Sequence, residues 1–103
     1  MREDNCYPIK IKIIGLIEIE GIFCTLPHPK LEVCVKAFGI ELGCIKGNPT
    51  NGIELSVNLI LIKGKLRFYL KSEGNQTCLF VDFDLTLILT GIRYHGTAKI
   101  FCY

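Results

Sequence analysis

Hydrophobic and polar residues alternate one by one along several stretches of this chain, and this pattern constrains the fold more than any other feature. Every second residue is apolar from Ile53 to Leu61, and one face of the stretch from Leu79 to Leu89 is entirely apolar. Successive side chains of a β-strand point to opposite faces of a sheet, so each stretch predicts a strand with one buried face. Shorter alternating stretches cover 9–13, 17–20, 31–37 and 66–71.

Composition also favours strands over helices. The 103 residues include 15 Ile, 13 Leu and 6 Phe but only 2 Ala, and β-branched and aromatic residues suit a pleated sheet. Turn-forming residues interrupt the apolar stretches at 47–52, at Gly64-Lys65 and at Thr90-Gly91. The length suits one core, so we expect a single domain over 1–103, an all-β antiparallel sandwich or small barrel of about seven or eight strands.

Six cysteines lie far apart in the sequence: Cys6, Cys24, Cys34, Cys44, Cys78 and Cys102. An even number of cysteines in a short chain is typical of a disulfide framework in a secreted protein. Zinc sites need clustered ligands, whereas no two cysteines here are closer than ten positions. We therefore expect disulfides and no metal or other cofactor; a reduced intracellular protein with buried thiols is the alternative.

Two turns predict how the cysteines pair. Thr90 lies midway between Cys78 and Cys102, and Gly39 lies midway between Cys34 and Cys44. A three-residue loop centred on each position would therefore set the two cysteines opposite one another. Directly opposed cysteines at a non-hydrogen-bonded position of two antiparallel strands are close enough to be bridged. The pairing that follows is Cys78–Cys102, Cys34–Cys44 and, for the two that are left, Cys6–Cys24.

Asn75 begins the triplet Asn75-Gln76-Thr77, which matches the acceptor sequence for N-linked glycosylation and follows a turn-like stretch. A glycan at Asn75 would fit a surface loop of a secreted protein. The segment 1–4 leads directly into the domain, and we take Met1 as the initiator of a mature chain. Cysteine content and sequon together predict a secreted protein.

Several classes of function are disfavoured. The net charge of +2 is too small for a bulk electrostatic nucleic-acid binder, and no apolar run approaches the roughly 20 residues of a membrane-spanning helix. Asp82 and Asp84 share one strand face, but such a pair is far more often hydrated than catalytic or calcium-binding. His28 and His95 have no partner that the sequence can assign, so we expect no enzymatic activity.

Charges are arranged symmetrically about Gly15 in the apolar run 9–23: lysines precede it and glutamates follow it. We interpret this run as one surface strand that is bent at Gly15. Two copies paired antiparallel would set each lysine opposite a glutamate, which favours a homo-oligomer. The alternative is that the charges only keep an outer face hydrated. The candidate interface residues are Lys10, Lys12, Ile14, Gly15, Leu16, Glu18 and Glu20.

Several strands also carry apolar residues on the face that should be polar. A sandwich core buries one face of each strand, so a second apolar face needs a partner chain, a lipid surface, an enclosed ligand or cover from neighbouring loops. The residues concerned are Ile14, Leu16, Ile22, Ile60, Ile62, Phe80 and Ile88.

Two segments resemble a family of small secreted cysteine-rich arthropod domains. They are Val33-Cys34-Val35, Phe38 and Cys44-Ile45-Lys46-Gly47 in the first, and Gly96-Thr97-Ala98-Lys99-Ile100-Phe101-Cys102-Tyr103 in the second. A similar domain occurs in the lytic saliva and venom proteins of predatory and blood-feeding bugs, the trialysin and redulysin type. The resemblance implies a secreted, disulfide-bonded β domain. The N-terminal cysteine spacings are wider here and the basic amphipathic segment that carries lysis is missing, so no functional residue is carried over.

These observations predict a secreted, non-enzymatic binding or assembly module. We expect it to act through an apolar sheet surface, by self-association or by contact with a protein or a lipid membrane. The alternatives are a carrier of a small hydrophobic ligand and a membrane-active venom or defence domain.

Overall fold

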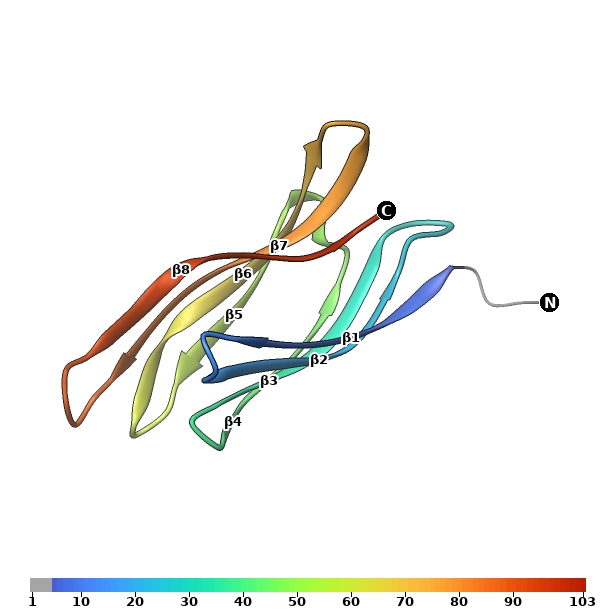
Figure 1. Ribbon diagram of the computed structural model, residues 1–103. Helices are drawn as coiled ribbons and strands as arrows, with labels where there is room; N and C mark the ends of the chain where they lie inside the picture. Colours follow the sequence, from blue (N-terminus) through green and yellow to red (C-terminus); the bar gives the residue numbers. More distant parts are fainter. Residues whose placement is uncertain (1–4) are drawn as a thin grey trace.

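The computed structural model describes residues 5–103, which form two four-stranded antiparallel sheets (Figure 1). Sheet A contains β1 (Cys6–Ile13), β2 (Ile17–Cys24), β3 (Lys30–Ala37) and β4 (Ile40–Gly47). Sheet B contains β5 (Ile53–Asn58), β6 (Ile62–Glu73), β7 (Gln76–Leu87) and β8 (Arg93–Cys102). Within each sheet every strand pairs with the next along the chain, and the short 3-10 helix η1 (Pro49–Asn51) connects the two sheets.

The two sheets pack against each other, and the alternating stretches supply the core between them. β2 contributes the fully buried Ile19 and Phe23, and β7 contributes the fully buried Leu79 and Val81. None of the buried side chains in the described part of the chain is polar or charged, so the core is held by apolar packing. The prediction of an all-β, disulfide-bonded sandwich is confirmed; residues 5–103 form two separate sheets and not one closed barrel.

The stretch 9–23 is a β-hairpin, so the prediction of one bent strand is wrong. Ile14 (φ 45°) and Gly15 (φ 71°) adopt left-handed backbone conformations, and the amide of Leu16 donates a hydrogen bond of 3.0 Å to the carbonyl of Ile13. The chain therefore reverses at 14–16, and β1 and β2 lie side by side.

The hairpin turn predicted at Gly64-Lys65 is also wrong, because both residues lie inside β6. Gly64 is paired with Val57 on β5 and with Leu85 on β7, and the chain reverses at 59–61 instead. A Cβ atom on Gly64 would lie 1.9 Å from the carbonyl oxygen of Asp84. This glycine therefore marks a close approach of two strands and not a turn.

The predicted disulfide pairing is confirmed, although the loops that produce it differ from the prediction. The β3–β4 turn has two residues, Phe38-Gly39, and the β7–β8 turn spans 88–92. In each hairpin a register shift, at Val35/Lys36 and at Leu79/Phe80, compensates for the loop length. The bridges join directly opposed residues with Cα–Cα distances of 3.9–4.0 Å: Cys6–Cys24, Cys34–Cys44 and Cys78–Cys102.

Gly21 in β2 provides a first test of the packing of sheet A. A Cβ atom at this position would lie 2.0 Å from the carbonyl oxygen of Glu32 and 2.6 Å from Cα of Val33. Because both atoms belong to the backbone of β3, we expect Gly21→Ala to lower the free energy of unfolding by about 2–3 kcal/mol. Gly47→Ala is the control, since its nearest neighbour is the Ile53 side chain at 3.5 Å. Urea unfolding that gives equal losses for both variants would contradict the described strand packing.

Candidate functional site

Four hairpin turns gather at one end of the sandwich, and we call this the turn end (Figure 1). Hydrogen bonds join neighbouring turns: the amide of Phe38 donates to the carbonyl of Leu16 at 3.2 Å, and the amide of Ile88 donates to the carbonyl of Leu61 at 2.9 Å. The ring of Phe38 also packs against Tyr94 of β8, with 5.3 Å between the ring centroids. The turns of both sheets therefore form one continuous surface.

The turns of the turn end contain no charged residue. Their sequences are Ile14-Gly15-Leu16, Phe38-Gly39, Leu59-Ile60-Leu61 and Ile88-Leu89-Thr90-Gly91-Ile92. Turns usually take Gly, Pro, Asn, Asp and Ser, and exposed apolar residues in them indicate a binding surface. Among residues 5–103, six of the ten large hydrophobic residues that are exposed lie here, and the most exposed are Ile60 at 89% and Leu89 at 84%.

Some apolar side chains of these turns anchor them to the core while others project outward. Leu16, Phe38 and Leu59 are partly buried and pack against the core cluster. Ile60 and Leu89 point away from it and are almost fully exposed. Because the inward side chains and the inter-turn hydrogen bonds hold the backbone, the outward side chains are presented by a fixed scaffold.

A collar of charged residues lies behind the turns, and most of them lie opposite a residue of the other sign. On sheet A the strand register sets four charged residues across the sheet in alternating sign. On sheet B the guanidinium of Arg93 donates hydrogen bonds of 2.9 and 2.8 Å to the carboxylate of Asp84. The sheet A row is Lys12, Glu18, Lys36 and Glu41, and Lys12 forms an ion pair of 3.7 Å with Glu18.

The charge symmetry about Gly15 is a property of one hairpin. Lys10 lies opposite Glu20 and Lys12 opposite Glu18 within the same chain. The cross-strand pairs that we expected between two copies are thus formed inside the monomer, and the symmetry no longer argues for a dimer. A homo-oligomer stays a prediction.

The predicted second apolar face also has a different explanation. Ile14, Leu16, Ile60 and Ile88 lie in turns, and Ile62 is buried in the core. Two further residues do lie on outer sheet faces. Phe80 is covered by the stacked ring of Tyr69, at 5.7 Å between centroids, whereas Ile22 remains 41% exposed. The main apolar surface is therefore the turn end and not a sheet face.

The paired carboxylates on β7 are both engaged by neighbouring side chains. Asp82 accepts hydrogen bonds from the hydroxyl of Tyr69 at 3.0 Å and from the hydroxyl of Thr97 at 2.7 Å. Burial and then this hydrogen bond raise the pKa of Tyr69. Asp84 is held by Arg93. These contacts describe a structural network on the outer face of sheet B.

The Asp84–Arg93 pair predicts a defined pH dependence. Hydrogen bonding from Arg93 lowers the pKa of Asp84 below its usual value. The pair therefore stabilises the fold above the pKa that Asp84 has in the unfolded chain, and this contribution is lost as the pH falls through the folded-state pKa. We expect Arg93→Gln to destabilise the protein at neutral pH and to have little effect in strong acid, as measured by urea unfolding. An equal loss at both pH values would contradict this role.

Two disulfides lie beside a carboxylate, but neither cluster is a plausible cation site. Glu41 adjoins Cys34–Cys44, and Glu73 adjoins Cys78–Cys102. The sulfur atoms are bonded to each other, and metals bind the thiolate form of cysteine. Glu73 also forms an ion pair with Lys99. We assign no metal site to the described residues.

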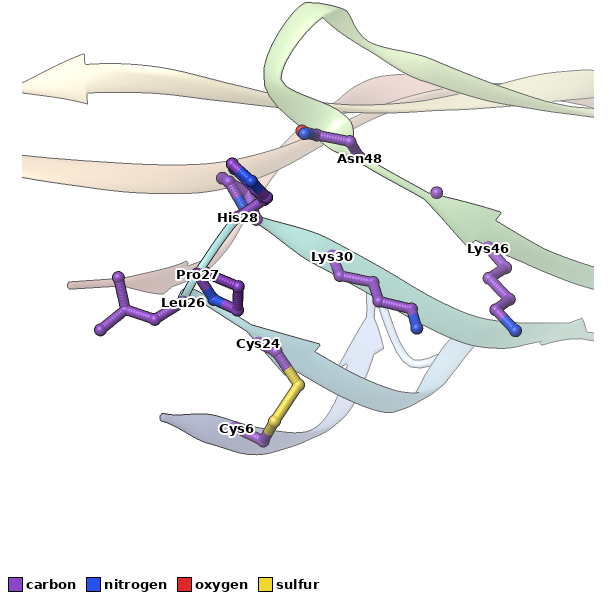
Figure 2. Close-up of a pocket in the computed structure, with 10 residues that line it drawn as sticks. Cys6, Cys24, Leu26, Pro27, His28, Lys30, Lys46 and Asn48 are labelled. Carbon is purple, nitrogen blue, oxygen red and sulfur yellow. A yellow bond between two sulfur atoms is a disulfide. The ribbon is translucent and has the colours of Figure 1, made fainter. Parts of the chain in front are cut away.

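A groove of about 660 Å³ lies at the opposite end of sheet A, beside the β2–β3 loop (Figure 2). The residues that line the groove were not predicted to form a binding site, although Cys6 and Cys24 were predicted as disulfide cysteines. The groove joins a loop to a strand end about 20 positions away in the sequence. It is lined by Cys6, Cys24, Leu26, Pro27, His28, Pro29, Lys30, Lys46, Gly47 and Asn48.

The glycosylation candidate Asn75 is exposed in the turn between β6 and β7, which lies at the end of sheet B away from the turn end (Figure 1). No helix in residues 5–103 is long and apolar enough to cross a bilayer. Three disulfides in so small a domain are consistent with an extracellular location. Comparisons of the chain with protein-family models, curated proteins and solved structures found no match.

Proposed function

We propose that this protein is a secreted, non-enzymatic binding module that attaches to membrane surfaces by inserting the turn end into the lipid interface. The observation that carries the proposal is the convergence of four uncharged turns at one end of a rigid sandwich. An exposed apolar surface rimmed by polar residues is characteristic of a contact site for a membrane or a protein.

The shape of the turn end favours lipid over a folded protein partner. Ile14, Ile60 and Leu89 project from three different turns as separate tips, and each is more than half exposed. An interfacial segment buries its apolar side chains about 5–10 Å into the boundary between headgroups and acyl chains. Full burial of two such side chains contributes about 3–6 kcal/mol, which is sufficient for reversible attachment.

The position of the remaining features agrees with this orientation. The charged collar of Lys12, Glu18, Lys36 and Glu41 would lie at headgroup level, directly behind the inserted turns. Asn75 lies away from the turn end, where a glycan would not obstruct the bilayer.

Vesicle flotation tests the proposal directly. The oxidised protein is mixed with phosphatidylcholine vesicles and separated on a density gradient. We expect the protein to float with the lipid and to leave the vesicles intact, because it attaches without a lytic segment. Protein that stays at the bottom of the gradient would overturn the proposal. If native mass spectrometry then shows integer multiples of the chain mass, self-association replaces membrane attachment as the function to be tested at the turn end.

The charge balance of the collar predicts weak dependence on lipid charge and salt. Lys12 is paired with Glu18, and Arg93 with Asp84, so Lys63 is the one exposed cation directly behind the described turns that lies opposite uncharged residues. We expect the affinities for neutral and for phosphatidylserine-containing vesicles to differ by less than about threefold, and added salt to change them little. Binding that requires anionic lipid and vanishes at high salt would contradict an apolar mode of attachment.

A further inference from the structure

The groove beside the β2–β3 loop is a second candidate site, and it is remote from the turn end. The eight residues of β2 (Ile17–Cys24) separate the two, a distance of about 25 Å for an extended strand. If the turn end lies in a bilayer, the groove faces the aqueous side. Ligand binding in the groove would not depend on the proposed membrane function.

The groove has apolar walls made by a loop of restricted conformation. Pro27 and Pro29 fix the path of the loop, and the amide of Thr25 ties its base to the carbonyl of Asn5 by a hydrogen bond of 3.1 Å. The Cys6–Cys24 bridge and Leu26 add apolar surface (Figure 2). Gly47 on β4 has no side chain to fill the space.

The polar groups of the groove are cationic or hydrogen-bond donors. His28, Lys30 and Lys46 line it, and its described lining contains no carboxylate. Lys30 lies opposite Cys24 on β2 and has no acidic residue as cross-strand partner. Lys46 lies opposite Glu32 but forms no ion pair within 4.0 Å with a described residue.

Lys30 differs from the other lysines on the outer face of sheet A. Those lysines, Lys46 included, lie opposite a glutamate on a neighbouring strand, as in the row from Lys12 to Glu41. Lys30 and Lys46 are diagonal neighbours on adjacent strands, a placement that sets their backbones about 7–8 Å apart. Figure 2 shows their side chains extending in the same direction. Two ammonium groups so placed can contact the same anion.

Asn48 supplies a further donor at the loop side of the groove. Its side-chain oxygen already accepts hydrogen bonds from the amide of Thr50 at 2.9 Å and from the hydroxyl of Thr50 at 2.6 Å. The amide nitrogen of Asn48 is left to donate to a ligand, and His28 lies on the same side (Figure 2).

We propose that this groove binds a phosphate monoester whose organic part packs on the Cys6–Cys24 bridge, Leu26 and Pro27. Lysine ammonium groups bind phosphate as point charges, and two of them on neighbouring strands match a doubly charged head. The apolar walls distinguish an organic phosphate from the inorganic ion. Because a free metabolite and a lipid headgroup share this chemistry, the experiment has to separate them.

Phenyl phosphate is the probe, and its binding to the oxidised full-length chain is followed by amide chemical shifts. We expect saturable shifts at 24–30 and 46–48, and inorganic phosphate should bind at least about tenfold more weakly. Lys30→Gln with Lys46→Gln should reduce the affinity for phenyl phosphate at least about tenfold. The matched control is Lys10→Gln with Lys36→Gln, which removes the same charge from lysines of the same sheet that do not line the groove.

Three results would overturn the proposal: no saturable shift, shifts spread over all lysines, or equal loss in the control variant. A second arm uses vesicles that contain phosphatidic acid. If the Lys30/Lys46 variant loses binding to these vesicles while a turn-end variant keeps it, the ligand is a lipid headgroup. If soluble phenyl phosphate binds, and vesicle binding is the same with and without the two lysines, the ligand is a free phosphate ester. Failure of phosphatidylcholine flotation alone would affect only the membrane proposal.

Discussion

Introducing two aspartates at the turn end, Ile60→Asp with Leu89→Asp, is expected to weaken binding to phosphatidylcholine vesicles by about 100-fold or more. Each wild-type side chain contributes about 1.5–3 kcal/mol when it passes from water into an apolar environment, and each 1.4 kcal/mol is a factor of ten in affinity. The aspartates remove that contribution and add carboxylates that the interface disfavours. Because the two side chains are 89% and 84% exposed, the fold itself should lose little stability.

The chain offers a matched control for this variant. Ile22 and Leu26 are also exposed, at 41% and 53%, but they lie at the groove end of β2. Ile22→Asp with Leu26→Asp removes the same number of apolar side chains and adds the same charge. We expect this variant to float with vesicles like the wild type. Equal loss in both variants would show that net charge governs the binding and would exclude insertion of the turn end.

A third variant tests whether the turns act together. Ile14 belongs to sheet A, whereas Ile60 and Leu89 belong to the turns of sheet B. If all tips enter the same bilayer, Ile14→Asp should weaken binding further when it is combined with the sheet B changes. If Ile14→Asp does not change vesicle binding, either alone or combined with the sheet B changes, the membrane contact is restricted to the turns of sheet B.

The strands and disulfides could be predicted because both follow from local periodicity. Because side chains alternate with a period of two along a strand, Leu79 and Val81 were predicted to face the core without any knowledge of the neighbouring strands. The predicted cysteine pairing was correct although the predicted loop lengths were wrong, because the register shifts at Val35/Lys36 and Leu79/Phe80 compensate for the difference.

The turns at Gly39 and Thr90-Gly91 were predicted, but the turns at 14–16 and 59–61 were not, because apolar residues dominate them. Ile-Gly-Leu at 14–16 and Leu-Ile-Leu at 59–61 read as continuations of strands, so their side chains were assigned to a sheet face. One signal was present in the sequence: charges that mirror each other about Gly15 are what a hairpin centred on that glycine requires. The mirror symmetry fits pairing within one chain as well as pairing between two.

The groove could not be predicted for a different reason. His28 and Lys30 meet Lys46 and Asn48 only because the β3–β4 hairpin returns the chain to the β2–β3 loop. No local pattern in the sequence relates these positions. The placement of Lys30 opposite Cys24, and its diagonal relation to Lys46, becomes visible only when the register is known.

Removal of the Cys78–Cys102 bridge is expected to cause the largest loss of stability of any single pair. Cys78 is fully buried, and the bridge joins residues 24 positions apart. Cross-linking a loop of this size stabilises a fold by about 3–4 kcal/mol, chiefly by restricting the unfolded chain. We expect Cys78→Ala with Cys102→Ala to show that loss in urea unfolding. Cys34→Ala with Cys44→Ala is the control, with a loss of about 2–3 kcal/mol, because this bridge is exposed and spans only 10 positions.

Reduction of all three bridges extends the same argument to the compartment in which the protein acts. Their summed contribution, on the order of 9 kcal/mol, is comparable to the whole stability of a small domain, about 5–15 kcal/mol. We therefore expect the fully reduced chain to lose its β-sheet circular dichroism and its binding to vesicles at room temperature. That result would mean that the protein folds only where disulfides persist, which is outside the cytosol. If the reduced chain keeps both the spectrum and vesicle binding, the apolar core alone sustains the fold, and the disulfides no longer support secretion.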